Sequence, residues 1–189
     1  MSENQRLEPF QGVWPAMFTP VLGNGELNPK ELEKLIELLI SEGVDGLYLL
    51  GSTGQGFLFS EKQRKNITET TLEIVNNRLP VMVQVGAMNT DESVRLAKHA
   101  AEHGVNAISS VGPIYYASSP SMASEHYKRI ATATELPFFP YQIGNAIMNK
   151  EVIQHLKSIP NVCGMKLTTP NLVEISNIHN SAGSKWRLF

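Results

Sequence analysis

Short apolar runs alternate with longer segments of helical periodicity along the whole chain, and this alternation limits the possible folds more than any other feature. Seven runs have the length and composition of buried parallel strands: residues 13–21, 46–50, 81–85, 107–111, 138–143, 162–167 and 186–189. From the start of one run to the start of the next, the distance along the chain is about the length of one βα unit. Strict βαβα order predicts an α/β fold with a parallel sheet covered by helices, either an open doubly wound sheet or a closed barrel.

Residues that accept the free N–H groups of a first helical turn stand where the helical periods begin. Five such starts are Asn28-Pro29, Ser60-Glu61, Ser119-Pro120, Asn149-Lys150 and Thr169-Pro170. Gly43 and Gly104 stand where two helices should end, and they predict left-handed turns there. No change of composition and no linker divides the chain, so residues 1–189 are expected to form a single domain.

Composition and charge exclude several classes of partner. The 16 basic and 18 acidic residues are spread without runs and give a net charge of -2, so neither nucleic acid nor an anionic membrane surface is expected to bind. No apolar run is long enough to span a membrane. Cys163 is the only cysteine, which excludes an intrachain disulfide and a cysteine metal site. A reducing compartment follows, and we expect a cytoplasmic protein.

Lys166 ends an apolar run within a predicted buried strand. Burial disfavours the ammonium form of a lysine and favours the nucleophilic amine, which can form a Schiff base with a carbonyl substrate. A lysine that extends out of the strand end, or pairs with a carboxylate, is the alternative. Tyr141 lies in the preceding predicted strand and could relay a proton at such a site, although strand tyrosines are also common in cores.

Polar residues also follow the second and fourth predicted strands, at the edge where parallel α/β folds carry their functional groups. The segment Gly51-Ser52-Thr53-Gly54-Gln55-Gly56 offers backbone N–H groups and two hydroxyls to a small anion such as a carboxylate. It lacks the lysine of a nucleotide P-loop, and a simple strand-to-helix turn is the alternative. Tyr115 and Tyr116 add two phenols after the fourth predicted strand, where a surface loop is the alternative.

The histidines predict no metal site. His99 and His103 have the i, i+4 spacing of a metal-binding pair, but apolar residues occupy the other face of their predicted helix, so both imidazoles are expected to be solvated. His126, His155 and His179 also lie on predicted helices, without the glutamate-containing motif of metalloproteases.

Four motifs together resemble the N-acetylneuraminate lyase and dihydrodipicolinate synthase family, in order and in spacing as well as in residue type. They are Gly51-Ser52-Thr53-Gly54, Pro113-Ile114-Tyr115-Tyr116, Tyr141 and Gly164-Met165-Lys166. The resemblance extends from about Phe10 to Phe189. It implies a (β/α)8 TIM barrel of class I aldolase type that acts on pyruvate or another 2-keto acid.

The same resemblance implies a role for each motif. Lys166 would form a covalent imine with the keto acid, and no cofactor would be needed. Tyr141 would relay protons, and Tyr116 or Tyr115 would complete the relay, often across a subunit contact in this family. Ser52 and Thr53 would hold the pyruvyl carboxylate, and the substrate-binding residues would further include Gly54, Tyr115 and Thr168. An aldehyde or a sugar would be the second small-molecule partner beside pyruvate. A homo-oligomer, a tetramer by family resemblance, is implied as well.

Three positions bear on the choice of substrate. Ala146 stands where the synthases of the family place an arginine for the second substrate, which favours a lyase, and Thr168 is closer to the lyase branch. Gln55 replaces the glutamate usual in the family. The expected function is therefore an aldol lyase that cleaves N-acetylneuraminate to pyruvate and N-acetylmannosamine. The alternative is 4-hydroxy-tetrahydrodipicolinate synthase or another 2-keto-acid aldolase of the family.

The chain ends at Phe189, after the seventh predicted strand, whereas the family continues through an eighth unit and a helical tail. The expectation is therefore a barrel truncated after the seventh strand, which carries the pyruvate half of the site. The non-enzymatic alternative is an inactive fragment that binds 2-keto acids or mediates subunit association.

Overall fold

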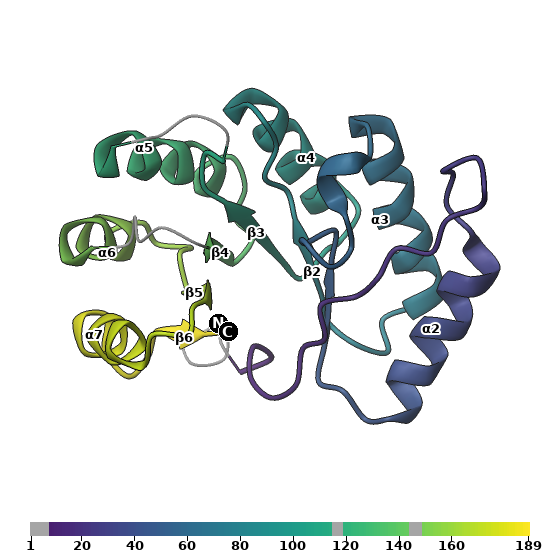
Figure 1. The fold of residues 1–189 in the computed structure, drawn as a ribbon, viewed down its shortest axis with the longest axis horizontal. Coiled ribbons are helices and arrows are strands. Elements are labelled where there is room, and N and C mark those ends of the chain that lie inside the picture. Colours follow the sequence, from purple (N-terminus) through teal and green to yellow (C-terminus); the bar gives the residue numbers. More distant parts are fainter. Residues whose placement is uncertain (1–7, 115–118, 144–148) are drawn as a thin grey trace. The chain divides into compact units, whose positions relative to one another are not determined.

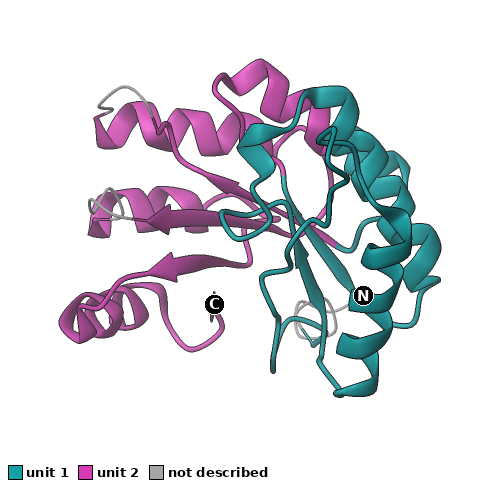
Figure 2. Cartoon of the chain, turned by 45° about the vertical axis from the view of Figure 1, so that its right-hand side comes forward, with its two compact units in different colours: residues 1–84, 99–106 teal, residues 85–98, 107–189 magenta. Residues whose placement is uncertain are grey.

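Figure 1 shows the computed structural model of the chain, which describes residues 8–114, 119–143 and 149–189. Contacts divide the chain into two compact units, coloured separately in Figure 2. The first unit comprises residues 1–84 and 99–106, and the second comprises residues 85–98 and 107–189. Within the described residues, no helix combines the length and the apolar character needed to cross a membrane.

The first unit is a two-stranded parallel sheet with helices packed beside it. Its elements are α2 (Pro29–Ser41), β1 (Leu47–Leu49), the 3-10 helix η1 (Gly56–Leu58), α3 (Glu61–Val75), β2 (Val81–Gln84) and the last turn of α4 (Thr90–Glu102). Leu47 of β1 lies opposite Val81 of β2 in parallel register. Helix α2 packs against α3, as Figure 1 shows, and buries Leu32 and Ile36.

The helix boundaries of the first unit follow from the predicted caps. The Asn28 side chain accepts a hydrogen bond from Glu31 N, and Pro29 fills the first helical position of α2. Ser60 and Gln63 form both hydrogen bonds of a capping box at the start of α3. The two predicted left-handed turns are confirmed, because Gly43 has φ +74° and Gly104 has φ +80°.

The first predicted strand, residues 13–21, is wrong. Its residues form only isolated bridges, one of which pairs Ala16 with Tyr48 of β1 in parallel. The physical reason lies in Pro15 and Pro20, because each proline removes an N–H donor that a continuous ladder needs. The other six predicted strands are confirmed, with boundaries shifted by at most a few residues.

The second unit is a four-stranded parallel sheet in the order β3-β4-β5-β6. Its elements, after the start of α4, are β3 (Ala107–Val111), α5 (Pro120–Ala131), β4 (Phe138–Ile143), α6 (Lys150–Lys157), β5 (Gly164–Thr168), α7 (Leu172–Ala182) and β6 (Arg187–Leu188). Helix α6 lies between α5 and α7 and packs against both (Figure 1). The predicted alternation of parallel strands and helices is thus present within each unit.

One predicted helix start in the second unit is displaced. The helix expected at Thr169-Pro170 begins at Leu172 instead, and Asn171 caps it by accepting hydrogen bonds from the N–H groups of Val173 and Glu174. The Thr169 hydroxyl instead accepts from Asn171 N over 3.1 Å and donates to the Glu174 carboxylate over 2.6 Å, so it holds the turn that precedes the helix. The predicted caps Ser119 and Asn149 are confirmed at α5 and α6.

His126 is a buried polar residue of α5 in the second unit. Its Nε2 lies 3.4 Å from the Val111 carbonyl oxygen, which can only accept, and its Nδ1 lies 2.9 Å from Thr90 Oγ1. These partners fit a neutral ring with the proton on Nε2. Burial lowers the pKa of His126, the Val111 carbonyl partly opposes this shift, and the nearby Arg129 charge adds to it.

This burial predicts a loss of stability in mild acid. The unfolded chain takes up a proton at His126 near the ordinary pKa of about 6.5, whereas the folded chain does so only at lower pH. The contribution of His126 to the free energy of unfolding should therefore be fully present above about pH 6.5. It should be lost progressively as the pH decreases toward the pKa of His126 in the folded chain. Urea unfolding at several pH values measures this slope. His126→Gln should have a smaller slope than the parent, and an equal slope in both proteins would contradict the assignment.

Candidate active site

The second unit places Lys166, Thr168 and Tyr141 on one face of its sheet. Lys166 of β5 lies directly opposite Tyr141 of β4 in parallel register, so both side chains leave the same face. Thr168 is two residues beyond Lys166 on β5 and shares that face, because side chains alternate along a strand. All three residues stand at or near the carboxyl ends of their strands, as expected for a site in a parallel α/β fold.

These three side chains contact one another. Lys166 Nζ donates a hydrogen bond to Thr168 Oγ1 over 3.2 Å, and the same nitrogen lies 3.9 Å from the centroid of the Tyr141 ring. The Tyr141 hydroxyl lies 3.2 Å from Thr168 Oγ1. Thr168 therefore connects the amine to the phenol, and a proton can pass between them through its hydroxyl. The amine is a nucleophile suited to a carbonyl carbon.

The surroundings of Lys166 differ from the expectation in one respect. Its side chain is half-buried rather than fully buried, whereas the Tyr141 side chain is buried. Its Nζ instead contacts an aromatic face and a hydroxyl. The Tyr141 ring and the Thr168 hydroxyl therefore hold the amine in position, in addition to its partial burial.

Tyr127 of α5 supports this site from behind the sheet, and sequence reasoning did not identify it. Its hydroxyl donates to the backbone carbonyl of Tyr141 over 3.0 Å. Burial strongly raises the pKa of Tyr127, so the phenol stays protonated and remains a donor. Tyr127 thereby fixes the backbone from which the Tyr141 side chain projects.

Glu174 in the first turn of α7 is a second supporting residue that the sequence did not reveal. One carboxylate oxygen accepts from Gln142 Nε2 over 2.7 Å, and the other accepts from Thr169 Oγ1 over 2.6 Å. Gln142 follows Tyr141 in β4, and Thr169 follows Thr168 after β5. Glu174 therefore ties together the ends of the two strands that carry the candidate residues. An acidic residue in a first helical turn is the only signal in the sequence, and it points to helix capping.

The predicted anion-binding segment lies in the first unit, directly after β1. Leu50 and Gln55 both adopt left-handed backbone conformations, with φ of +57° and +53°. Leu50 is buried as well, and such conformations are costly for residues other than glycine. Strain of this kind, held at a strand end by its surroundings, often marks a functional turn.

Close backbone packing explains the glycines of this turn. A Cβ atom at Gly56 would lie 1.9 Å from the Leu50 carbonyl oxygen, and one at Gly54 would lie 2.8 Å from the Met17 carbonyl oxygen. The Gly54 carbonyl also accepts a hydrogen bond from Thr19 Oγ1 over 2.8 Å. These contacts hold the turn in one conformation.

Ser52 and Thr53 are the exposed hydroxyl residues of this turn. Within the described part of the chain, neither hydroxyl takes part in a hydrogen bond, so both can bind a ligand. The structure therefore places Ser52, Thr53 and Gly54 together in the first unit, and Lys166, Tyr141 and Thr168 together in the second. Tyr115, Tyr116 and Ala146 lie outside the described residues.

The prediction that the imidazoles of His99 and His103 are both solvated is wrong for His99. Only 12% of its side chain is exposed, and its Nε2 lies 2.7 Å from Glu69 Oε1 of α3. His103 remains exposed. The periodicity of α4 alone could not reveal this contact, because it depends on a residue 30 positions away in another helix.

Comparisons with known proteins identify related sequences and folds. The model of the dihydrodipicolinate synthetase family matches residues 9–189. The chain is 32% identical over 176 residues to an N-acetylneuraminate lyase of Citrobacter koseri. It is 34% identical over 175 residues to a 4-hydroxy-tetrahydrodipicolinate synthase of Desulfotalea psychrophila. Each match covers 91% of this chain but only 59% of the relative, so the chain spans about three-fifths of the length of these relatives.

Solved structures give the same result. A catalytic lysine mutant of the Ruminococcus gnavus sialic acid aldolase matches with a TM-score of 0.91 and 27% identity, over 96% of this chain and 61% of that one. An N-acetylneuraminate lyase from Mycoplasma synoviae matches with a TM-score of 0.88 and 28% identity, over 96% and 63% of the two chains. These matches confirm the predicted α/β fold class, that of a (β/α) barrel aldolase.

Proposed function

Because the chain belongs to the dihydrodipicolinate synthetase family, we propose that it carries the pyruvate-binding part of a class I aldolase in which Lys166 forms the Schiff base. Members of this family use a lysine Schiff base and no external cofactor. The observation that carries the proposal is the contact of Lys166 Nζ with both the Thr168 hydroxyl and the Tyr141 ring.

The proposed reaction begins when the neutral Lys166 amine attacks the keto carbon of the substrate. The resulting carbinolamine loses water and leaves a protonated imine. In the cleavage direction, a base removes the proton of the substrate hydroxyl and the adjacent carbon–carbon bond breaks. Its electron pair moves into the imine to give an enamine, and the aldehyde leaves. Protonation of the enamine carbon and hydrolysis then release pyruvate and regenerate Lys166.

The other candidate residues take supporting roles in this proposal. Tyr141 relays the protons, and its contact with Thr168 connects it to the reacting nitrogen. Tyr116 or Tyr115 completes the relay. Ser52 and Thr53 hold the pyruvyl carboxylate with their exposed hydroxyls, and Gly54 contributes to the same turn.

For the whole protein we propose cleavage of N-acetylneuraminate to pyruvate and N-acetylmannosamine. Ala146 supports this choice, because a methyl group offers neither a positive charge nor a hydrogen-bond donor to a second substrate carboxylate. Thr168 supports it by its similarity to the lyase branch. The similar identities to a lyase and to a synthase, 32% and 34%, do not favour either activity. The alternative is therefore 4-hydroxy-tetrahydrodipicolinate synthase.

Two assays of the natural, full-length protein separate these activities. N-acetylneuraminate should release pyruvate, which a coupled lactate dehydrogenase assay measures. Pyruvate with aspartate semialdehyde should give little condensation. Condensation without cleavage of N-acetylneuraminate would assign the protein to the synthases. If neither reaction occurs, the result favours the non-enzymatic alternative, in which the chain binds 2-keto acids or mediates subunit association.

The remaining expectations form part of the same proposal. A cytoplasmic location is supported by the single cysteine, Cys163, which is a buried free thiol. A homo-oligomer, in the form of a tetramer, is supported by the family resemblance. A single barrel domain is supported by the family match, which runs without interruption over residues 9–189.

A further inference from the structure

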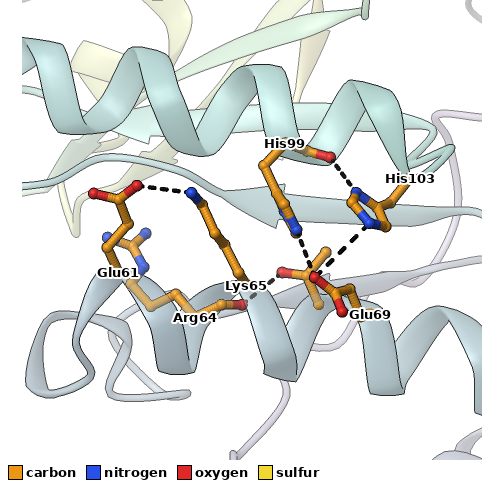
Figure 3. Close-up of polar contacts among 7 residues, drawn as sticks. Glu61, Arg64, Lys65, Glu69, His99 and His103 are labelled. Carbon is orange, nitrogen blue, oxygen red and sulfur yellow. Dashed lines mark hydrogen bonds and ion pairs between the residues drawn. The ribbon is translucent and has the colours of Figure 1, made fainter.

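A cluster of two imidazoles and a carboxylate lies in the first unit, at the end of α4 and on the neighbouring α3. His99 is in the last turn of α4, and His103 is the residue directly after that helix. Glu69 lies in α3. Figure 3 shows that Glu69 faces both imidazoles. None of these residues has a part in the proposed aldolase reaction.

The geometry of the cluster is close to that of a metal site. His99 Nε2 lies 2.7 Å from Glu69 Oε1, and His103 Nε2 lies 3.8 Å from the same oxygen. The three ligand atoms all lie within 4.8 Å of one another. Bonds of about 2.0–2.2 Å to a tetrahedral zinc ion place neighbouring ligand atoms about 3.3–3.5 Å apart. The observed separations lie on both sides of this value, so small side-chain adjustments would complete the site.

Hydrogen bonding prepares His103 to act as a ligand. Its Nδ1 lies 2.8 Å from the His99 carbonyl oxygen, which can only accept, so Nδ1 carries the proton in the neutral ring. The lone pair is then on Nε2, the atom that faces Glu69. Metal-ligating histidines are commonly oriented by such a bond from the other ring nitrogen. The His99 and His103 rings lie 4.1 Å apart between centroids, which restricts their orientation further.

The lysine one turn away on α3 does not pair with the Glu69 carboxylate, which therefore remains available to the two histidines. Lys65 lies one turn before Glu69 on α3, but its Nζ pairs with Glu61 Oε1 over 2.8 Å (Figure 3). Side chains of Glu69 and His103 are 42% and 40% exposed, so an ion can enter from solvent. His99 contributes a largely buried ligand held against the same carboxylate.

We propose that Glu69, His99 and His103 bind a divalent late first-row transition metal ion of the zinc class, with solvent in a fourth position. Two imidazoles and one carboxylate with an open position are a ligand set that suits zinc. Magnesium and calcium require mainly oxygen ligands, and this cluster offers one carboxylate. The bound ion would connect α3 to the end of α4, with the proton of His99 moving to Nδ1 when Nε2 binds the metal.

The test is titration of the full-length protein, without a polyhistidine tag, with Zn²⁺ in competition with a chromophoric chelator. The parent should bind a single Zn²⁺ per chain at this site and should not bind Mg²⁺ there. Glu69→Gln and His103→Gln should each lose at least about tenfold in Zn²⁺ affinity, since even outer-shell changes cost 10- to 100-fold. Glu73→Gln removes an exposed carboxylate from the same helix outside the cluster, and the Zn²⁺ affinity of this variant should equal that of the parent.

Thermal melting gives a second readout. Saturating Zn²⁺ should raise the Tm of the parent and of Glu73→Gln, because an ion that binds only the folded state stabilises it. It should not raise the Tm of the two cluster variants. Equal Zn²⁺ affinity in the parent and in His103→Gln, or no binding by the parent, would overturn the proposal. His103 is exposed, so this variant decides the question even if Glu69→Gln fails to fold.

Discussion

Replacing Lys166 by arginine is expected to abolish turnover of the natural, full-length protein. A guanidinium group stays protonated at neutral pH and has no nucleophilic amine, so the imine cannot form. The loss should be on the order of 10⁶, the scale of effect that follows removal of a covalent nucleophile. Arginine keeps a cation beside the Tyr141 ring and Thr168, which limits damage to the fold.

The measurement is steady-state release of pyruvate from the cleaved substrate, with circular dichroism as a check on folding. Lys157→Arg is the matched control, because Lys157 is an exposed lysine at the end of α6 in the same unit. Its activity should equal that of the parent. Retention of more than a small fraction of activity in Lys166→Arg would remove Lys166 from the proposed chemistry.

Replacing Tyr141 by phenylalanine should lower kcat by about 10²- to 10⁴-fold, the usual contribution of a positioned acid or base. The phenyl ring keeps its contact with Lys166 Nζ, whereas the hydroxyl that contacts Thr168 Oγ1 is lost. The two functions of Tyr141 are thereby separated. Imine formation should persist, while the proton transfers become slow and KM changes much less than kcat.

Stopped-flow or steady-state kinetics of Tyr141→Phe measures this separation. Tyr127→Phe is the comparison, because it removes a buried hydroxyl that donates to the Tyr141 backbone carbonyl and touches no reacting group. It should cost about 1 kcal/mol of stability and leave most of kcat intact. A kcat of Tyr141→Phe within about twofold of the parent would assign the proton relay to another residue.

Features that depend on neighbours in the sequence were predictable. Proline at a helix start, a capping box and glycine after a helix all act within a few residues, and Asn28, Ser60 and Gly43 take the positions that these patterns indicate. The apolar strands were equally clear because burial on both faces leaves a continuous apolar run. The failure at residues 13–21 came from Pro15 and Pro20, which stand within the apolar run and interrupt the backbone ladder.

The sequence indicated candidate residues for the chemistry but not the contacts that hold them in place. Lys166 and Tyr141 stood out as polar residues in apolar strands, and the register that places them opposite each other agrees with that interpretation. The supports from Tyr127 and Glu174 depend on contacts between a helix and a strand end, which no local pattern encodes. The same reason explains why the contact between Glu69 and His99 was not predicted.

The central claim is that Lys166 forms an imine with pyruvate, and trapping by borohydride tests it most directly. Borohydride reduces an imine to a stable amine, so the natural protein incubated with pyruvate should gain one reduced pyruvyl group per chain. Peptide mapping by mass spectrometry should locate this group on Lys166, and Lys166→Arg should gain none. A label on a different lysine, or a label that persists in Lys166→Arg, would contradict the account.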